Sequence, residues 1–89
     1  MTATLYGCKR CGSAAVEMAL AVAGVRYRHV TVWSQTESKE LDALRRVNPL
    51  GQVPTLVFAD GTVMSESAAI LIELGLRHPA SGLLASEPR

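Results

Sequence analysis

The first third of the chain carries a strand, a helix and a second strand in succession, and this order constrains the fold most. Thr4-Leu5-Tyr6 is a short β-prone run, and from Ser13 apolar residues recur at helical spacing up to Gly24, a typical C-cap glycine. The alternating, β-branched segment from Tyr27 to Trp33 predicts the second strand. Two strands joined by a helix lie parallel with a right-handed crossover, so a parallel pair is expected.

A short helix is predicted in the middle of the chain. Leu41 and Leu44 form its apolar side, and Asn48-Pro49-Leu50-Gly51 is a turn that follows it. Ser34 has capping-box spacing and is one candidate N-cap for this helix, and Thr36 is its rival.

A hairpin and a last helix complete the pattern. Thr55 to Phe58 and Thr62 to Met64 predict two strands, and Asp60-Gly61 between them is a strong hairpin signal. Ser65 is predicted to cap a final helix from about Glu66 to Arg77.

The sequence therefore predicts an α/β fold with the order β-α-β-α-β-β-α. A parallel pair followed by an antiparallel hairpin makes a four-stranded mixed sheet, which with three helices is the thioredoxin-like architecture. The chain has 89 residues, enough for one small domain with one core. We expect that domain to span residues 1–80, with residues 81–89 as a tail or a linker.

Composition and charge exclude several kinds of partner. Apolar residues make up 48% of the chain and charged residues 19%, which is typical of a folded protein. The net charge of +1 gives no basic surface for nucleic acid or an anionic membrane, so neither is expected as a partner. The run from Ala14 to Val25 contains Glu17 and is too short to span a bilayer. No signal-peptide pattern is visible, so a cytoplasmic location is expected.

Cys8-Lys9-Arg10-Cys11 lies between the first predicted strand and the first predicted helix. A thiol there lies near the positive end of the helix dipole, and Lys9 and Arg10 add positive charge. Both features favour the thiolate over the thiol, so at least one cysteine is expected to be reactive. Such a pair also closes a disulfide, which gives the segment redox chemistry.

Three other roles for this segment stay open. Zinc needs four ligands, and His29 and His78 are more typical of a strand and a helix end, so no metal is expected. The second alternative is that both cysteines are small packing residues, a role that suits Cys8 better than Cys11. The third alternative is that the two cysteines take no part in the chemistry and that Ser13 carries it instead.

Two further segments have the groups to bind a ligand. A cis Val53-Pro54 bond at a strand start would turn the Val53 backbone toward the first-helix loop, where it pairs with an extended peptide; a trans bond is the commoner state. Ser65-Glu66-Ser67 begins the last helix, where N–H groups and a hydroxyl accept a carboxylate and Glu66 accepts an ammonium. Helix capping alone is the simpler explanation of these residues.

Together these segments resemble the N-terminal domain of the glutathione transferase superfamily. The resemblance runs from about Leu5 to Pro79, and its most specific part is the proline-centred stretch followed shortly by a Glu-Ser-x-Ala-Ile helix start. The matching segments are Leu5-Tyr6-Gly7, Gly12 to Glu17, Asn48 to Leu56, and Asp60-Gly61 with Met64 to Ile70.

The resemblance implies a binding site for glutathione as co-substrate, without a metal. Pro54 is expected to be cis, and the Val53 backbone to pair with the cysteinyl part of glutathione. Glu66 and Ser67 are expected to hold the γ-glutamyl end, and Gln52 to reach the glycine end.

The resemblance also places the glutathione thiol at the loop from Cys11 to Ser13. Many family members carry a Ser or Tyr there that donates to the thiolate, and others carry a Cys that forms a mixed disulfide. Because cysteine is a poor donor and a good nucleophile, Cys11 favours thiol–disulfide exchange over conjugation. We expect Cys11 to lead the chemistry, with Cys8 as its resolving partner and Ser13 as the fallback.

Three functions therefore stay open: a glutathione transferase or its N-terminal domain, a stand-alone glutaredoxin-like thiol oxidoreductase, and a non-catalytic interaction module. The family normally continues into an all-helical second domain, and this chain ends at Arg89, about where that domain would begin. The expected partners are glutathione, that helical domain if the natural chain is longer, and a second copy of the chain through exposed apolar surface.

Overall fold

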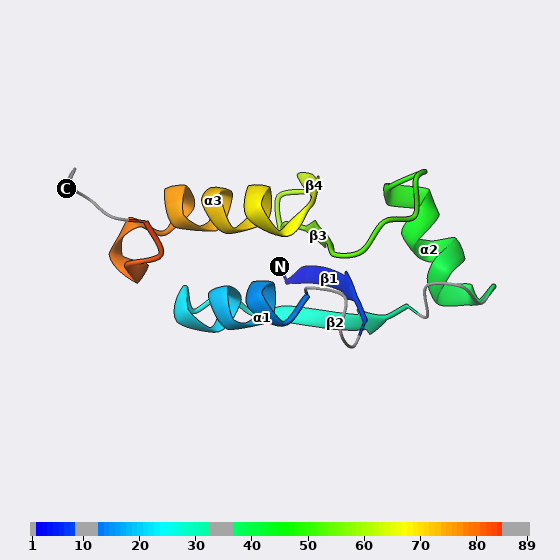
Figure 1. The fold of residues 1–89 in the computed structure, drawn as a ribbon, viewed down its shortest axis with the longest axis horizontal. Coiled ribbons are helices and arrows are strands. Elements are labelled where there is room, and N and C mark those ends of the chain that lie inside the picture. The colour runs from blue at the N-terminus through cyan, green and yellow to red at the C-terminus, as the bar shows by residue number, and fades with distance from the viewer. Residues whose placement is uncertain (1, 9–12, 33–36, 85–89) are drawn as a thin grey trace.

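A computed structural model describes residues 2–8, 13–32 and 37–84 and shows a sheet covered by helices (Figure 1). Its elements are, in chain order, β1 (Ala3–Gly7), α1 (Ser13–Val22), β2 (Tyr27–Thr31), α2 (Lys39–Val47), β3 (Thr55–Val57), β4 (Val63–Ser65), α3 (Ser67–Arg77) and the 3-10 helix η1 (Pro79–Ser81). The predicted order of strands and helices is confirmed. The second strand is shorter than predicted and ends at Thr31; Trp33 lies outside the described residues.

The sheet has four strands in the order β2-β1-β3-β4. β1 and β2 are parallel, as the β-α-β unit requires, with Leu5 opposite His29. β3 is antiparallel to both β1 and β4, with Leu56 opposite Leu5 on one side and Met64 on the other. The mixed sheet with three α-helices is the predicted thioredoxin-like fold.

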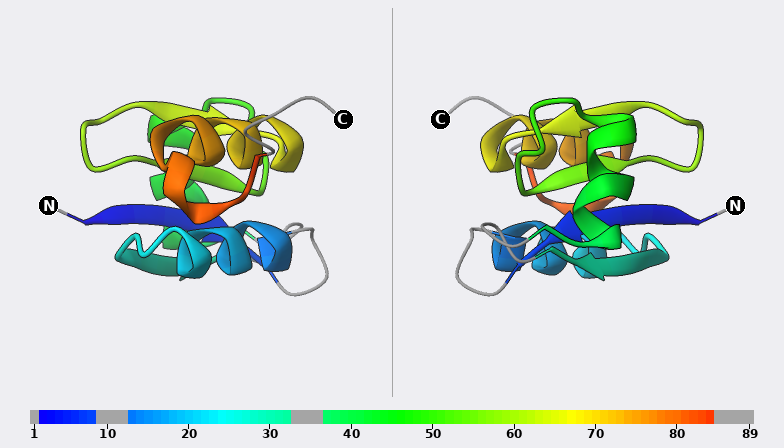
Figure 2. Two further views of the ribbon diagram at one scale, coloured as in Figure 1. Left: turned by 90° about the vertical axis from the view of Figure 1, so that its left-hand side faces the viewer. Right: turned by 90° about the vertical axis from the view of Figure 1, so that its right-hand side faces the viewer.

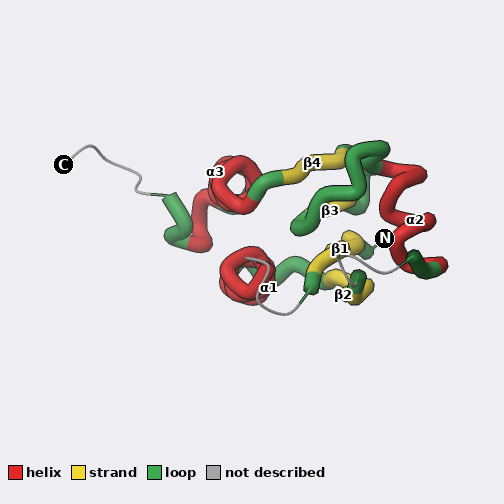
Figure 3. The backbone as a smooth tube through the Cα atoms, turned by 45° about the vertical axis from the view of Figure 1, so that its right-hand side comes forward, coloured by secondary structure: helices red, strands yellow, loops and turns green. Residues whose placement is uncertain are grey.

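Helices cover both faces of the sheet (Figure 2 and Figure 3). α1 and α3 lie side by side on one face, and α2 lies alone on the other. Successive side chains of β1 point to opposite faces of the sheet. Leu5 packs toward α1 and α3, and Tyr6 packs toward α2. Among the described ranges, no helix combines the length and apolar character that crossing a bilayer requires.

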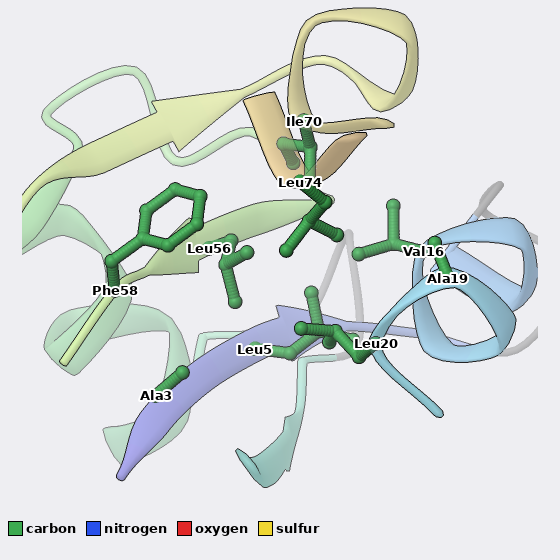
Figure 4. Close-up of a cluster of buried hydrophobic side chains, with 9 residues drawn as sticks. All are labelled: Ala3, Leu5, Val16, Ala19, Leu20, Leu56, Phe58, Ile70 and Leu74. Atoms are coloured by element: carbon green, nitrogen blue, oxygen red, sulfur yellow. The ribbon is translucent and has the colours of Figure 1, made fainter. Parts of the chain in front are cut away.

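The main core fills the space between the sheet and the pair α1 and α3 (Figure 4). The contributing elements β1, α1 and α3 each supply side chains from one stripe only, which is the pattern of an amphipathic element packed on one side. Burying each large aliphatic side chain here contributes about 1.5–3 kcal/mol. The buried members are Ala3, Leu5, Val16, Ala19, Leu20, Leu56, Phe58, Ile70 and Leu74.

A smaller core holds α2 against the opposite face, through Leu41 and Leu44 packed on Tyr6 and Val32. The N-cap of α2 is Ser38, whose hydroxyl accepts a hydrogen bond from the Leu41 N–H at 3.1 Å. The prediction that Ser34 or Thr36 caps this helix is therefore wrong; both residues lie outside the described ranges. The N-cap, Ser38, lies closer to Leu41 than predicted, because the apolar side of α2 begins only at Leu41.

The boundary between β4 and α3 also differs from the prediction. Ser65 is the last residue of β4, paired with Thr55, so it is not the N-cap of the following helix. Glu66 holds the N-cap position, and α3 begins at Ser67 and ends at Arg77. Pairing with β3 extends β4 one residue further than expected and displaces the start of the helix.

The chain continues to pack after α3. Leu83 packs against the main core, and Leu84 occupies the space that a side chain on Gly75 would fill. The described part of the predicted tail, up to residue 84, therefore lies against α3.

Arg77 ties the end of α3 to the β3–β4 hairpin. Its guanidinium donates to Asp60 at 2.9 Å and to Glu73 at 2.7 Å, and lies 3.9 Å from the centroid of the Phe58 ring. The pKa of Asp60 is lowered, first by the Thr62 backbone N–H that it accepts and then by Arg77. The ion pairs of Arg77 and the hydrogen bond from Thr62 to Asp60 therefore stabilise the same junction between α3 and the β3–β4 hairpin.

We expect Ile70→Val to lower the free energy of unfolding by about 0.5–1.5 kcal/mol, because Ile70 is fully buried and the change leaves a methyl-sized gap. Ile72→Val is the matched control, since it makes the same change in the same helix at a side chain 52% exposed. Urea denaturation measures both, and equal effects of the two variants would contradict the assigned core.

Asp60→Asn should remove the contribution of the Asp60 charge to the free energy of unfolding, which is a contribution that acid also removes. The folded pKa of Asp60 lies below its ordinary value of 3.8, so its contribution is present above pH 3.8 and is lost as the pH falls through the folded pKa. Asn keeps an acceptor for Thr62 and loses the charge facing Arg77. Unfolding midpoints of the two proteins should differ at pH 7 and converge below the folded pKa; a gap that persists there would contradict the interpretation.

Candidate functional site

Three segments far apart in sequence meet at one end of the sheet. Tyr6 pairs with Thr55, and Thr55 pairs with Ser65, so these three residues form one row across β1, β3 and β4. Because β3 runs opposite to its two neighbours, this row stands at the end of β1, the beginning of β3 and the end of β4. The predicted site residues Cys8, Val53 and Glu66 lie within two residues of this row along the chain.

The first segment joins β1 to α1. Ser13 is buried, and its hydroxyl donates to the Cys8 carbonyl at 2.9 Å, which fastens the first turn of α1 to the end of β1. Gly7 allows this approach, because a Cβ there would lie 2.7 Å from the Ser13 Cβ. Cys8 is 6% exposed and disulfide-bonded. Cys11, the predicted leading residue, lies outside the described residues.

A polar cluster that the sequence did not reveal lies beside this junction. The Tyr27 hydroxyl donates to Glu17 at 3.2 Å, and the Nε2 of His29 lies 3.9 Å from the other carboxylate oxygen. Burial raises the pKa of Tyr27 first, and the Glu17 carboxylate raises it further. The available signal was weak: Tyr27 and His29 share a strand face, and nothing in the pattern placed Glu17 against them.

The second segment leads from α2 into β3. The Val53–Pro54 peptide is cis, Pro54 is buried and Gln52 is exposed. Thr55, fully buried, donates from its hydroxyl to the Gln52 carbonyl at 2.6 Å and accepts from the Asn48 side chain at 3.0 Å. These bonds hold the backbone before Pro54 in one arrangement, and sequence patterns alone did not predict them.

The third segment is the start of α3. Glu66 is exposed and has φ of 71° and ψ of 125°, and it is the one non-glycine residue with positive φ among those described. Such a conformation costs on the order of 1–3 kcal/mol and clusters at ligand sites. Ser67 is half-buried and is the first residue of α3, where backbone N–H groups face outward. This end of the helix has the geometry of an anion-binding position.

The structure thus brings Cys8, Ser13, Val53 and Glu66 to one end of the fold. Within the described ranges, no group of three or more His, Cys, Asp and Glu side chains is placed to hold a metal ion. The donors that are present suit an extended ligand with a free backbone and charged ends.

Comparison with known sequences shows the family to which the chain is similar. Residues 13–76 match the family model described as the glutathione S-transferase N-terminal domain. A probable maleylacetoacetate isomerase of Caenorhabditis elegans is 40% identical over 73 residues, which are 82% of this chain and 33% of that protein. An uncharacterised glutathione transferase-like protein of Escherichia coli K12, YncG, is 36% identical over 76 residues, covering 84% of this chain and 37% of that protein.

Solved structures are similar over nearly the whole chain. A glutathione transferase homologue from Sulfitobacter, with bound glutathione, superposes with a TM-score of 0.82 at 31% identity, covering 98% of this chain and 42% of that chain. A sphingomonad glutathione S-transferase complexed with glutathione gives a TM-score of 0.80 at 30% identity, covering 97% and 43%. This chain spans less than half the length of these proteins. The chain belongs to the glutathione S-transferase family and has the fold of that family's N-terminal domain.

Proposed function

We propose that this domain binds glutathione at the end of the sheet where β1, β3 and β4 bring their flanking segments together. The observation that carries the proposal is the row of Tyr6, Thr55 and Ser65, which aligns the three segments side by side. Two similar solved structures contain glutathione, and this supports the choice of ligand. The tripeptide also matches the site chemically, because it is extended and carries an ammonium and two carboxylates.

The contacts follow from the groups available in each segment. The Val53 backbone pairs with the cysteinyl unit of glutathione in the manner of an added strand. Glu66 accepts the γ-glutamyl ammonium, and the N-terminus of α3 with Ser67 receives the adjacent carboxylate. Gln52, which is exposed, lies on the side of the glycine end. The glutathione thiol then faces the segment that follows Cys8.

The chemistry that we propose is thiol–disulfide exchange at Cys11. Its thiolate attacks the glutathione sulfur of a mixed disulfide, and the departing thiolate takes up a proton. Either a second glutathione or Cys8 then attacks the Cys11–glutathione disulfide. The first route yields glutathione disulfide and the free Cys11 thiolate; the second releases glutathione and leaves a Cys8–Cys11 disulfide, which two further glutathiones reduce. The disulfide-bonded state of Cys8 supports this role for it.

Glutathione conjugation is the second candidate function, favoured by the length of the relatives. The matched proteins are more than twice as long as this chain, so a whole protein of this kind has further surface for a co-substrate. Met18 and Val22 of α1 and Ile72 and Leu76 of α3 are exposed apolar side chains on two adjacent helices. We propose that they contact a helical domain or a second copy of the chain. A cytoplasmic location stays a prediction.

Glu66→Gln should weaken glutathione binding about 10- to 100-fold, because a charge-assisted hydrogen bond to the ammonium is lost. Isothermal titration with glutathione measures the change. Cys-Gly, which lacks the γ-glutamyl unit, should bind wild type and variant equally. Glu73→Gln removes the same charge within α3, away from the N-cap position of Glu66, and serves as the control. Equal losses in both variants would count against the assigned contact, and absence of glutathione binding by the wild type would leave an interaction module as the better function.

Cys11→Ser should lower the rate of reduction of a glutathione mixed disulfide roughly 100-fold or more, because it removes the attacking sulfur. Cys8→Ser should retain most of the rate, since glutathione itself completes the cycle. A coupled assay of glutathione disulfide formation measures both. If both variants keep the wild-type rate, the exchange proposal fails, and activity that depends instead on Ser13 would favour conjugation.

A further inference from the structure

We infer that Thr55 and Asn48 are positioning residues that aim the Val53 N–H at the ligand. The inference rests on the proposed glutathione site and concerns two residues that have no assigned contact with glutathione. Its basis is a chain of hydrogen bonds that runs from the end of α2 through Asn48 and Thr55 to the Gln52 carbonyl.

The decisive contact is the bond from Thr55 to Gln52. The Thr55 hydroxyl donates to the Gln52 carbonyl at 2.6 Å, and that carbonyl belongs to the same planar peptide group as the Val53 N–H. In a trans peptide the two groups point in opposite directions, so holding the carbonyl on one side directs the N–H to the other. The Thr55 side chain is fully buried, so water does not reach the donating hydroxyl.

Asn48 controls which way the Thr55 hydroxyl points. A hydroxyl has one hydrogen and two acceptor positions, and the Asn48 Nδ2 donates to the Thr55 oxygen at 3.0 Å. With that oxygen already accepting, its hydrogen remains for the Gln52 carbonyl.

Asn48 is itself held in place by three further bonds. Its N–H donates to Leu44 at 2.8 Å, its carbonyl accepts from Gly51 at 2.8 Å, and its Oδ1 accepts from the Leu50 N–H at 3.2 Å. Asn48 is therefore anchored both to the end of α2 and within the turn that follows it. The rigid helix end is thus connected through two side chains to the peptide that faces the ligand.

Thr55→Val tests the inference because it keeps the shape of the side chain and removes both hydrogen bonds. We expect glutathione affinity to fall about five- to tenfold, measured by isothermal titration. Thr55→Ser retains the hydroxyl and should bind within about twofold of wild type. In ¹⁵N–¹H spectra, the glutathione-induced shift of the Val53 amide should shrink in Thr55→Val, while that of Ser67 remains.

Phe58→Leu is the control for lost stability, since Phe58 belongs to the main core and follows β3 at the end away from the site. It should lower the unfolding midpoint without changing glutathione affinity. Equal losses of affinity in Phe58→Leu and Thr55→Val would overturn the inference, and so would Thr55→Val binding as tightly as wild type.

Asn48→Asp provides an independent test that does not require a change in the core. A carboxylate in place of the amide accepts the Thr55 hydrogen and draws it from the Gln52 carbonyl, while an oxygen still faces the Leu50 N–H. Affinity should again fall about five- to tenfold. Leu50→Asp adds the same charge to the same turn at a residue 77% exposed, and should have a smaller effect. Equal effects overturn the inference. If wild type itself does not bind glutathione, the proposed function fails with it.

Discussion

The pairing of β1 with β3 is the contact on which the rest of the molecule depends. It joins the β-α-β unit to the hairpin, since β1 is otherwise paired with β2 and β3 with β4. Its register places Tyr6 opposite Thr55 and Leu5 opposite Leu56, which aligns the site segments and assigns side chains to the two cores at the same time. Because side chains alternate along a strand, a shift of one residue would exchange the core facing α1 and α3 with the core facing α2.

The proposed glutathione site consists mainly of backbone groups, so the residues that orient those groups matter as much as the residues that carry them. The proposed contacts of Val53 and the N-terminus of α3 are made by peptide N–H and carbonyl groups, whose directions depend on neighbouring residues. Ser13, Thr55 and Glu66 each fix such a direction, by a hydrogen bond to Cys8, a hydrogen bond to Gln52 and a positive φ respectively. Of these three residues, Thr55 has no proposed contact with glutathione, yet its hydrogen bond helps to fix the geometry of the proposed site.

Much of the site was predictable because it lies at the ends of elements with clear sequence signals. Cys8, Val53 and Glu66 were expected from strand ends, a proline at a strand start and a helix start, and pairing brings their segments together. Glu17 with Tyr27, and Asn48 with Thr55, were not predicted as contacts. Each pair joins two elements through side chains, and no periodicity records which residues on two neighbouring elements meet.

The succession of strands and helices, the apolar faces and the turns could be predicted from the amino-acid order alone, because periodicity and the placement of glycine and proline are local properties. The exact element boundaries and the side-chain hydrogen bonds depend on contact with another strand or helix, so the packed fold sets them. Ser65 belongs to β4 because it pairs with Thr55, and α2 begins at Lys39, with Ser38 as its N-cap, where Leu41 and Leu44 pack on Tyr6 and Val32. The bonds from Asn48 to Thr55 and from Thr55 to Gln52 join residues only seven and three positions apart, but they form only where the end of α2 and the start of β3 approach each other, and no sequence pattern records that approach.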